Sequence, residues 1–221
     1  MMHLIAGLGA LAMGCGILIR GPRGARDRLF TLLCAALALW NLAYLGRYEN
    51  ALWRPVYLLG ACAAAPLGLQ FILALTAAPR PSRRRYLVPA YALASLTWVI
   101  SWAPLPSLRW YRTYIALIVL GGILLAGLWV LGRHAFSRPA GAEKRALLYV
   151  LGGSVIAVIG GMSDFVPRRL FAITQLGPLA ILFFLLVVCV VLVRYRFLDV
   201  DVILGRVVVL LAGATIVALI L

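Results

Sequence analysis

The amino-acid sequence predicts an all-α polytopic bundle of seven membrane-spanning helices followed by a partial eighth. Of its 221 residues, 65% are hydrophobic and only 12% are charged, and the mean hydropathy is +1.05. A soluble core of this size cannot bury so much apolar surface. The apolar residues occur in long runs that lack the alternation of barrel strands, so the spans are predicted to be helices.

Apolar runs of roughly spanning length recur along the whole chain. They cover residues 3–19, 29–46, 55–77, 86–103, 113–132, 147–162 and 177–193, and an eighth run begins at Val207. The breaks between them are rich in Gly, Pro and charged residues, which is typical of loops. We therefore divide the chain into a seven-helix bundle (1–193), a cytoplasmic juxtamembrane segment (194–206) and the start of an eighth helix (207–221).

Three of these runs differ from the others in their flanks or their length. Residues 3–19 have no basic residue before them and arginines after them, the reverse of a cleavable signal peptide, so this run is expected to stay as a span. Residues 147–162 form a short run that can extend to Asp164 at the interface. Residues 207–221 fall short of the usual length of about 20 residues, so the native chain is expected to continue. The alternative is a complete small protein with a short last helix.

The basic residues are unequally divided between the two sides of the predicted bundle. Fifteen of the 21 Lys and Arg residues follow an odd-numbered run, and six follow an even-numbered run. Cytoplasmic loops carry the excess of basic residues. The N-terminus is therefore predicted to be outside, and residues 194–206 are predicted to be in the cytoplasm.

Few groups in the spans could support enzymatic chemistry. Every acidic residue falls in a loop or at a predicted interface, so no carboxylate is expected in mid-membrane for a proton relay. The four cysteines lie in separate apolar runs without CxxC spacing, and the two histidines are far apart in sequence, which argues against a metal site. The lone lysine, Lys144, lies in a loop, which excludes a retinal protein. We expect no catalytic residue, metal or cofactor, and no nucleic-acid partner because the basic residues form no continuous face.

Neutral polar and aromatic residues within the spans are the candidates for a ligand site. Trp40, Asn41 and Tyr44 fall near the outer half of the second run, with Trp40 and Tyr44 on one helical face. Gln70 lies in the third run and Trp98 in the fourth. These side chains could line a pocket for a small hydrophobic or membrane-derived ligand. The alternative is that the amides only form hydrogen bonds between helices, at about 1 kcal/mol each.

The segment RYRFLDVDVILGR, which lies between two apolar runs, is the candidate for signal coupling. Its charged residues are Arg194, Arg196, Asp199, Asp201 and Arg206. As a helix it could lie at the inner interface with an apolar stripe in lipid and its arginines among anionic headgroups. The alternative is an ordinary basic loop that only sets topology. Replacing both aspartates by Asn distinguishes the two, because signalling output changes only if the segment couples.

Two stretches resemble the seven-helix N-terminal sensor region of many bacterial histidine kinases. One is the third run, ACAAAPLGLQFILALTA, with a mid-span proline followed by Phe71. The other extends from Glu143 to Leu204 and ends in RYRFLDVDVIL, which resembles the element that follows the seventh helix in those kinases. The chain departs from the family in having no phosphoacceptor histidine region and no ATP-binding motif.

The resemblance implies a sensory input region of a two-component system, without catalytic activity of its own, in the bacterial inner (cytoplasmic) membrane. A ligand or membrane state would shift the populations of two helix arrangements. Membrane lipids and a second copy of the chain are the expected partners. The alternative is a small polytopic transporter or lipid-binding membrane protein, although no inverted repeat is apparent in the sequence.

The predicted topology can be tested by cysteine labelling in intact cells. Cysteines introduced at Glu49 and Arg109 should react with a membrane-impermeant maleimide from outside. Cysteines at Arg84 and Lys144 should react only after the membrane is permeabilised, because their loops carry the excess of basic residues. Labelling of position 84 in intact cells would contradict the topology.

Overall fold

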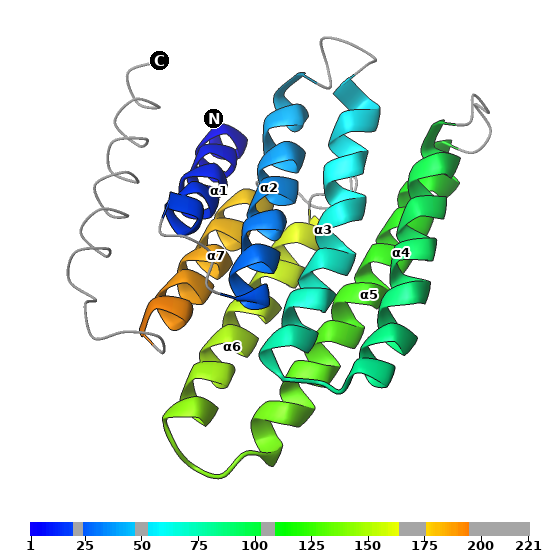
Figure 1. Ribbon diagram of the computed structural model, residues 1–221. Coiled ribbons are helices and arrows are strands. Elements are labelled where there is room, and N and C mark those ends of the chain that lie inside the picture. The colour runs from blue at the N-terminus through cyan, green and yellow to red at the C-terminus, as the bar shows by residue number, and fades with distance from the viewer. Residues whose placement is uncertain (20–23, 47–52, 103–108, 164–175, 195–221) are drawn as a thin grey trace.

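Helices account for nearly all of the residues that the computed structural model describes, which are 1–19, 24–46, 53–102, 109–163 and 176–194 (Figure 1). Within these ranges there are seven α-helices and no strand, which confirms the all-α prediction. The helices are α1 (Met2–Ile19), α2 (Ala25–Gly46), α3 (Trp53–Leu75), α4 (Arg80–Trp102), α5 (Arg109–Ser137), α6 (Ala142–Ser163) and α7 (Gly177–Arg194). The predicted start of an eighth helix lies outside the described residues.

Five of the seven helices are long and apolar enough to cross a membrane, as expected of a membrane protein. The qualifying segments are all of α1, α2 and α6, together with Pro55–Leu75 of α3 and Tyr114–Ser137 of α5. The apolar part of α7, Gly177–Leu192, is shorter. α4 does not qualify, because arginines occupy its first turns and because Ser, Thr, Tyr and Trp lower the mean hydropathy of the rest of the helix. The number of seven spans therefore stays a prediction.

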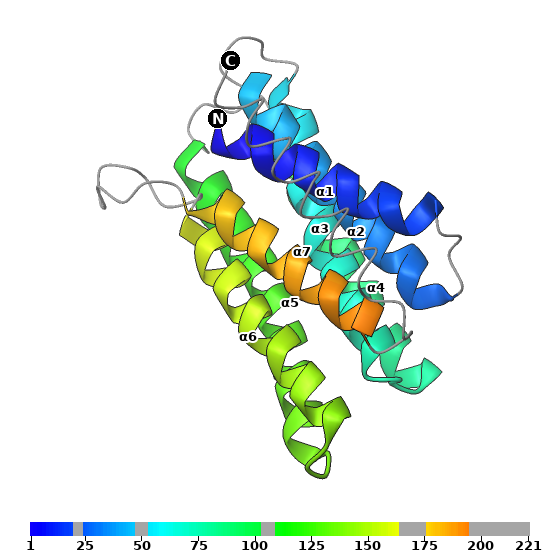
Figure 2. The ribbon, with the colours of Figure 1, turned by 90° about the vertical axis from the view of Figure 1, so that its left-hand side faces the viewer.

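Six of the helices form a closed ring. In the order α1, α2, α3, α5, α6 and α7 each helix packs on the next, and α7 packs on α1. α4 lies outside the ring against α3 and α5 (Figure 1). Successive helices run in opposite directions (Figures 1 and 2), so the first turns of α2, α4 and α6, which carry many of the basic residues, lie at one end. We call it the basic end.

A close approach of α2 and α3 fixes one side of the ring. A Cβ atom added at Gly60 of α3 would lie 2.5 Å from the backbone nitrogen of Trp40 on α2. No side chain fits between these backbones, so glycine is required there. At Gly160 of α6, an added Cβ atom would overlap the side-chain Cβ of Ala180 on α7. Small residues thus determine which helices can be neighbours.

The end of α3 is closed by a Schellman motif that contains no glycine. Ala77 has φ 49°, in the left-handed region. Its N–H donates to the carbonyl of Ala74 at 3.4 Å, and the N–H of Ala78 donates to the carbonyl of Leu73 at 3.1 Å. These are the two bonds of the motif. A residue with a Cβ atom in this conformation costs roughly 1 kcal/mol.

Replacing Ala77 with Gly should therefore stabilise the protein. The strain relieved is partly offset by the extra freedom of glycine in the unfolded chain, so we expect a net gain of about 0.5 kcal/mol. Unfolding of the detergent-solubilised protein by SDS titration measures it. Ala78→Gly is the matched control and should lose stability. Equal effects at both positions would show that the left-handed conformation at Ala77 carries no strain.

Candidate functional site

Four rings from three helices form a continuous chain at the end of the bundle opposite the basic end. His3 of α1 stacks on Tyr44 of α2, with centroids 3.6 Å apart and planes inclined at 14°. Tyr44 meets Tyr57 of α3 edge-on at 5.6 Å. The ring centroid of Tyr57 in turn lies 6.3 Å from that of Trp40 on α2. We call these four residues the aromatic chain.

A buried hydrogen bond ties the aromatic chain together. Nδ1 of His3 lies 3.0 Å from Oδ1 of Asn41, while the Asn41 amide nitrogen donates to the carbonyl of Leu37 at 2.8 Å. Because the Asn41 oxygen can only accept, Nδ1 of His3 carries the proton of this bond. Asn41 is 1% exposed and His3 is 6% exposed. The bond therefore joins α1 to α2 in an apolar environment.

The structure brings together three of the five predicted ligand residues. Trp40, Asn41 and Tyr44 lie in successive turns of α2 and all are buried. Trp40 and Tyr44 share a helical face, as their spacing predicts. Their partners His3 and Tyr57 were not among the candidates. Both lie in the first turns of their helices, and a search for polar and aromatic residues at matching depth in adjacent spans would have found them.

The other two candidates, Gln70 and Trp98, lie apart from the aromatic chain. The hydroxyl of Tyr91 on α4 donates to Oε1 of Gln70 on α3 at 2.6 Å. The indole nitrogen of Trp98 on α4 donates to the carbonyl of Pro55 on α3 at 3.1 Å. Both bonds attach α4 to the ring, which is the arrangement expected if these side chains link helices. A ligand role for either stays a prediction.

Beside the aromatic chain lies a cavity of about 90 Å³ inside the ring. α2, α3, α5, α6 and α7 all line it, and along α3 its lining extends from Ala61 to Ile72. The Trp40 side chain closes one side of the cavity and extends to α6. Its indole lies 3.8 Å from the position of a Cβ atom added at Gly161. The cavity thus joins five of the six ring helices.

The cavity lining is almost entirely apolar. The hydroxyl of its one hydroxyl residue, Ser154, donates to the carbonyl of Val150 on its own helix at 2.7 Å. A site without free polar partners excludes water and favours apolar guests. Elsewhere in the described part of the chain, no group of three or more His, Cys, Asp or Glu residues could hold a metal ion.

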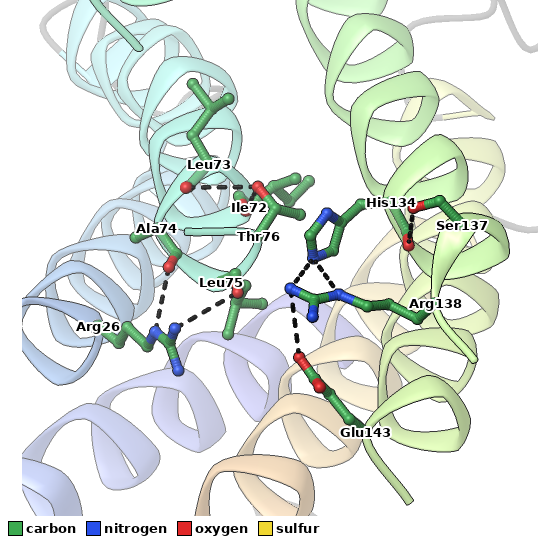
Figure 3. A network of polar contacts seen from close by, with 10 residues as sticks. All are labelled: Arg26, Ile72, Leu73, Ala74, Leu75, Thr76, His134, Ser137, Arg138 and Glu143. Carbon is green, nitrogen blue, oxygen red and sulfur yellow. Dashed lines mark hydrogen bonds and ion pairs between the residues drawn. The ribbon is translucent and has the colours of Figure 1, made fainter. Parts of the chain in front are cut away.

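At the basic end, Arg26 closes the last turn of α3. Figure 3 shows its guanidinium directed at two carbonyls of that turn. Nε donates to Ala74 at 3.1 Å and Nη2 donates to Leu75 at 3.5 Å. A cation is favoured at a helix C-terminus because it complements the helix dipole. This arginine therefore has a structural role in joining α2 to α3.

A second basic-end network holds the turn between α5 and α6 (Figure 3). Nε of Arg138 donates to Nε2 of His134 at 3.3 Å. The guanidinium also lies 3.8 Å from the carboxylate of Glu143. Both charged side chains are substantially exposed, so this ion pair contributes little stability.

The predicted coupling residues lie almost wholly beyond the described ranges. Arg194 is the last residue of α7. Arg196, Asp199, Asp201 and Arg206 lie outside the described residues.

Comparison of the chain with models of protein families, with curated proteins and with solved structures gave no match.

The hydrogen bond between His3 and Asn41 should contribute a measurable coupling free energy. A double-mutant cycle of His3→Phe and Asn41→Leu should give a coupling free energy of about 1 kcal/mol. The phenylalanine keeps an aromatic ring stacked on Tyr44, while the hydrogen bond is removed. SDS unfolding measures each variant. As a control, the effects of His3→Phe and Gln70→Leu should add, because these residues share no contact. Additive effects for His3 and Asn41 would show that the bond contributes nothing net.

Proposed function

We propose that the chain is the membrane-embedded sensory input region of a bacterial signalling protein of the histidine kinase type, and that its ligand occupies the central cavity. The N-terminus is placed outside and the basic end in the cytoplasm, following the distribution of Lys and Arg. The bacterial inner membrane and the kinase connection follow from the sequence resemblance.

The observation that carries the proposal is the apolar cavity shared by five helices. A guest there contacts several helices at once, so its affinity depends on how they are arranged. If the guest binds one helix arrangement more tightly than another, its binding raises the population of the first arrangement. The size of this shift is set by the difference in the guest's affinity for the two arrangements. A packing defect between two helices would lack this property.

The size and lining of the cavity define the class of ligand. A cavity of about 150 Å³ lined by Leu, Ile and Phe holds benzene or xenon, whereas this one has about 90 Å³. The guest is therefore an uncharged apolar molecule with only a few heavy atoms. The aromatic chain links Trp40 in the cavity wall to His3 at the start of α1, which brings the sixth ring helix into contact with the site.

Signal transfer is proposed to run through α7. Ile181 and Phe184 of α7 line the cavity, whereas Leu192, buried near the end of the same helix, does not. A shift of α7 on ligand binding would therefore also move its end at the basic end of the bundle. The predicted coupling segment, residues 194–206, begins at the last residue of α7 and continues the chain from there, consistent with the role predicted for it.

Xenon provides a direct probe of this mechanism. In nanodiscs under xenon pressure, methyl NMR signals of Leu124 and Ile181 in the cavity wall should shift. Leu192 signals should shift over the same pressure range, because α7 moves as a unit. Gly68→Leu should abolish both responses, since a Cβ atom at Gly68 meets its nearest neighbour at 3.9 Å and the side chain fills the cavity.

The matched control is Gly132→Leu, where an added Cβ atom also meets its nearest neighbour, a leucine methyl, at 3.9 Å. Gly132 does not line the cavity, so this variant should respond like the unmodified protein. Shifts confined to Leu124 and Ile181 would mean that the cavity binds xenon without transmitting a signal. That result would refute the sensory proposal.

A further inference from the structure

A long groove runs between α6 and α7, separate from the central cavity. Its volume is about 840 Å³, and none of its lining residues lines the cavity. α6 contributes Ala142, Arg145, Leu148, Tyr149, Gly152, Gly153 and Ile156, and α7 contributes Phe183, Leu186, Val187, Val190 and Val191. Figure 2 shows the two helices side by side.

The groove is apolar along its length and cationic at one end. Arg145 is exposed in the first turn of α6 at the basic end, next to Lys144. Among the described residues, its guanidinium has no ion-pair partner. Tyr149, one turn further along, is 63% exposed and can present its hydroxyl near the polar end. The groove thus combines a positive charge with an apolar channel.

Two adjacent glycines of α6 have different roles in shaping the groove. A Cβ atom added at Gly153 would meet Val187 of α7 at 3.5 Å, so this residue lies at the contact between the helices. A Cβ atom added at Gly152 would meet nothing within 4 Å. The missing side chain at Gly152 therefore keeps the groove open.

The length of the groove matches one leaflet of a bilayer. From Ala142 to Ile156 the helix rises about 21 Å at 1.5 Å per residue. A bilayer with its headgroup layers is about 40–45 Å thick, so one leaflet is about 20–22 Å. A phospholipid whose headgroup lies at Arg145 would have its acyl chain alongside Gly152 and Phe183.

We propose that this groove binds one phospholipid with an anionic headgroup. Arg145, with Lys144 beside it, attracts the net negative charge of the headgroup, and the apolar side chains of α6 and α7 contact one acyl chain. The proposal requires that α6 and α7 lie in a bilayer with the basic end at the headgroup layer. It does not depend on the sensory role or on the central cavity.

Native mass spectrometry of the purified full chain tests the proposal. The protein is incubated in detergent with phosphatidylglycerol or phosphatidylcholine of identical acyl chains, and the retained lipid is counted. Arg145→Gln is compared with Arg84→Gln, which removes an exposed arginine from α4 at the same end. Gly152→Trp is compared with Gly122→Trp on α5, where an added Cβ atom also meets nothing within 4 Å.

The unmodified chain should retain one phosphatidylglycerol in preference to phosphatidylcholine. Arg145→Gln should lower this retention about fivefold, the effect of one basic residue near an anionic surface, while Arg84→Gln should leave it within twofold. Gly152→Trp should abolish retention and Gly122→Trp should not. Circular dichroism checks that each variant is folded. If Gly152→Trp is not folded, the comparison of Arg145→Gln with Arg84→Gln alone tests the proposal.

Three results would overturn the proposal. One is equal retention of the two lipids by the unmodified chain. Another is an equal loss in Arg84→Gln and Arg145→Gln, which would indicate general attraction of lipid to the basic end. The third is full retention by folded Gly152→Trp. None of these bears on the xenon experiment, which uses a different probe and different residues.

Discussion

The contact of Gly60 with the backbone of Trp40 is the constraint on which the candidate site depends. Because no side chain separates α3 from α2 there, Tyr57, one turn before Gly60, lies against Tyr44 and Trp40. The Trp40 ring is directed across the bundle to α6. The aromatic chain and the closed side of the cavity are both consequences of this close approach.

Polar side chains form hydrogen bonds within a helix at some positions and between helices at others. Several buried polar side chains in the ring bond a carbonyl of their own helix, as Asn41 does with Leu37 and Ser154 with Val150. Such bonds satisfy the polar group but do not join helices. α4 is attached differently, through bonds from Tyr91 and Trp98 to α3. Polar bonds between ring helices are few among the described residues, such as those from His3 to Asn41 and from Arg26 to Ala74. The ring therefore relies mainly on apolar packing, which is where cavities and alternative arrangements arise.

The cavity and the groove share two helices. Ser154 of α6 and Phe184 of α7 face the cavity, whereas Gly152 and Phe183, on the same helices, face the groove. The periodicity of a helix allows this, because residues one or two positions apart point to different sides. Occupants on the two sides would therefore contact the same pair of helices from within and from outside.

The sequence by itself determined the helical class, the approximate positions of the helices, the basic end and the shared face of Trp40 and Tyr44, because hydropathy and helical period are local properties. Only the tertiary structure decided that α4 lies outside the ring, that His3 and Tyr57 join the candidate site, and that Gln70 pairs with Tyr91 instead. In lipid a residue facing the membrane is as apolar as one facing a neighbouring helix, so hydropathy cannot distinguish the two. Helix neighbours are set by the fit of small residues such as Gly60 across an interface, which involves parts of the chain far apart in sequence.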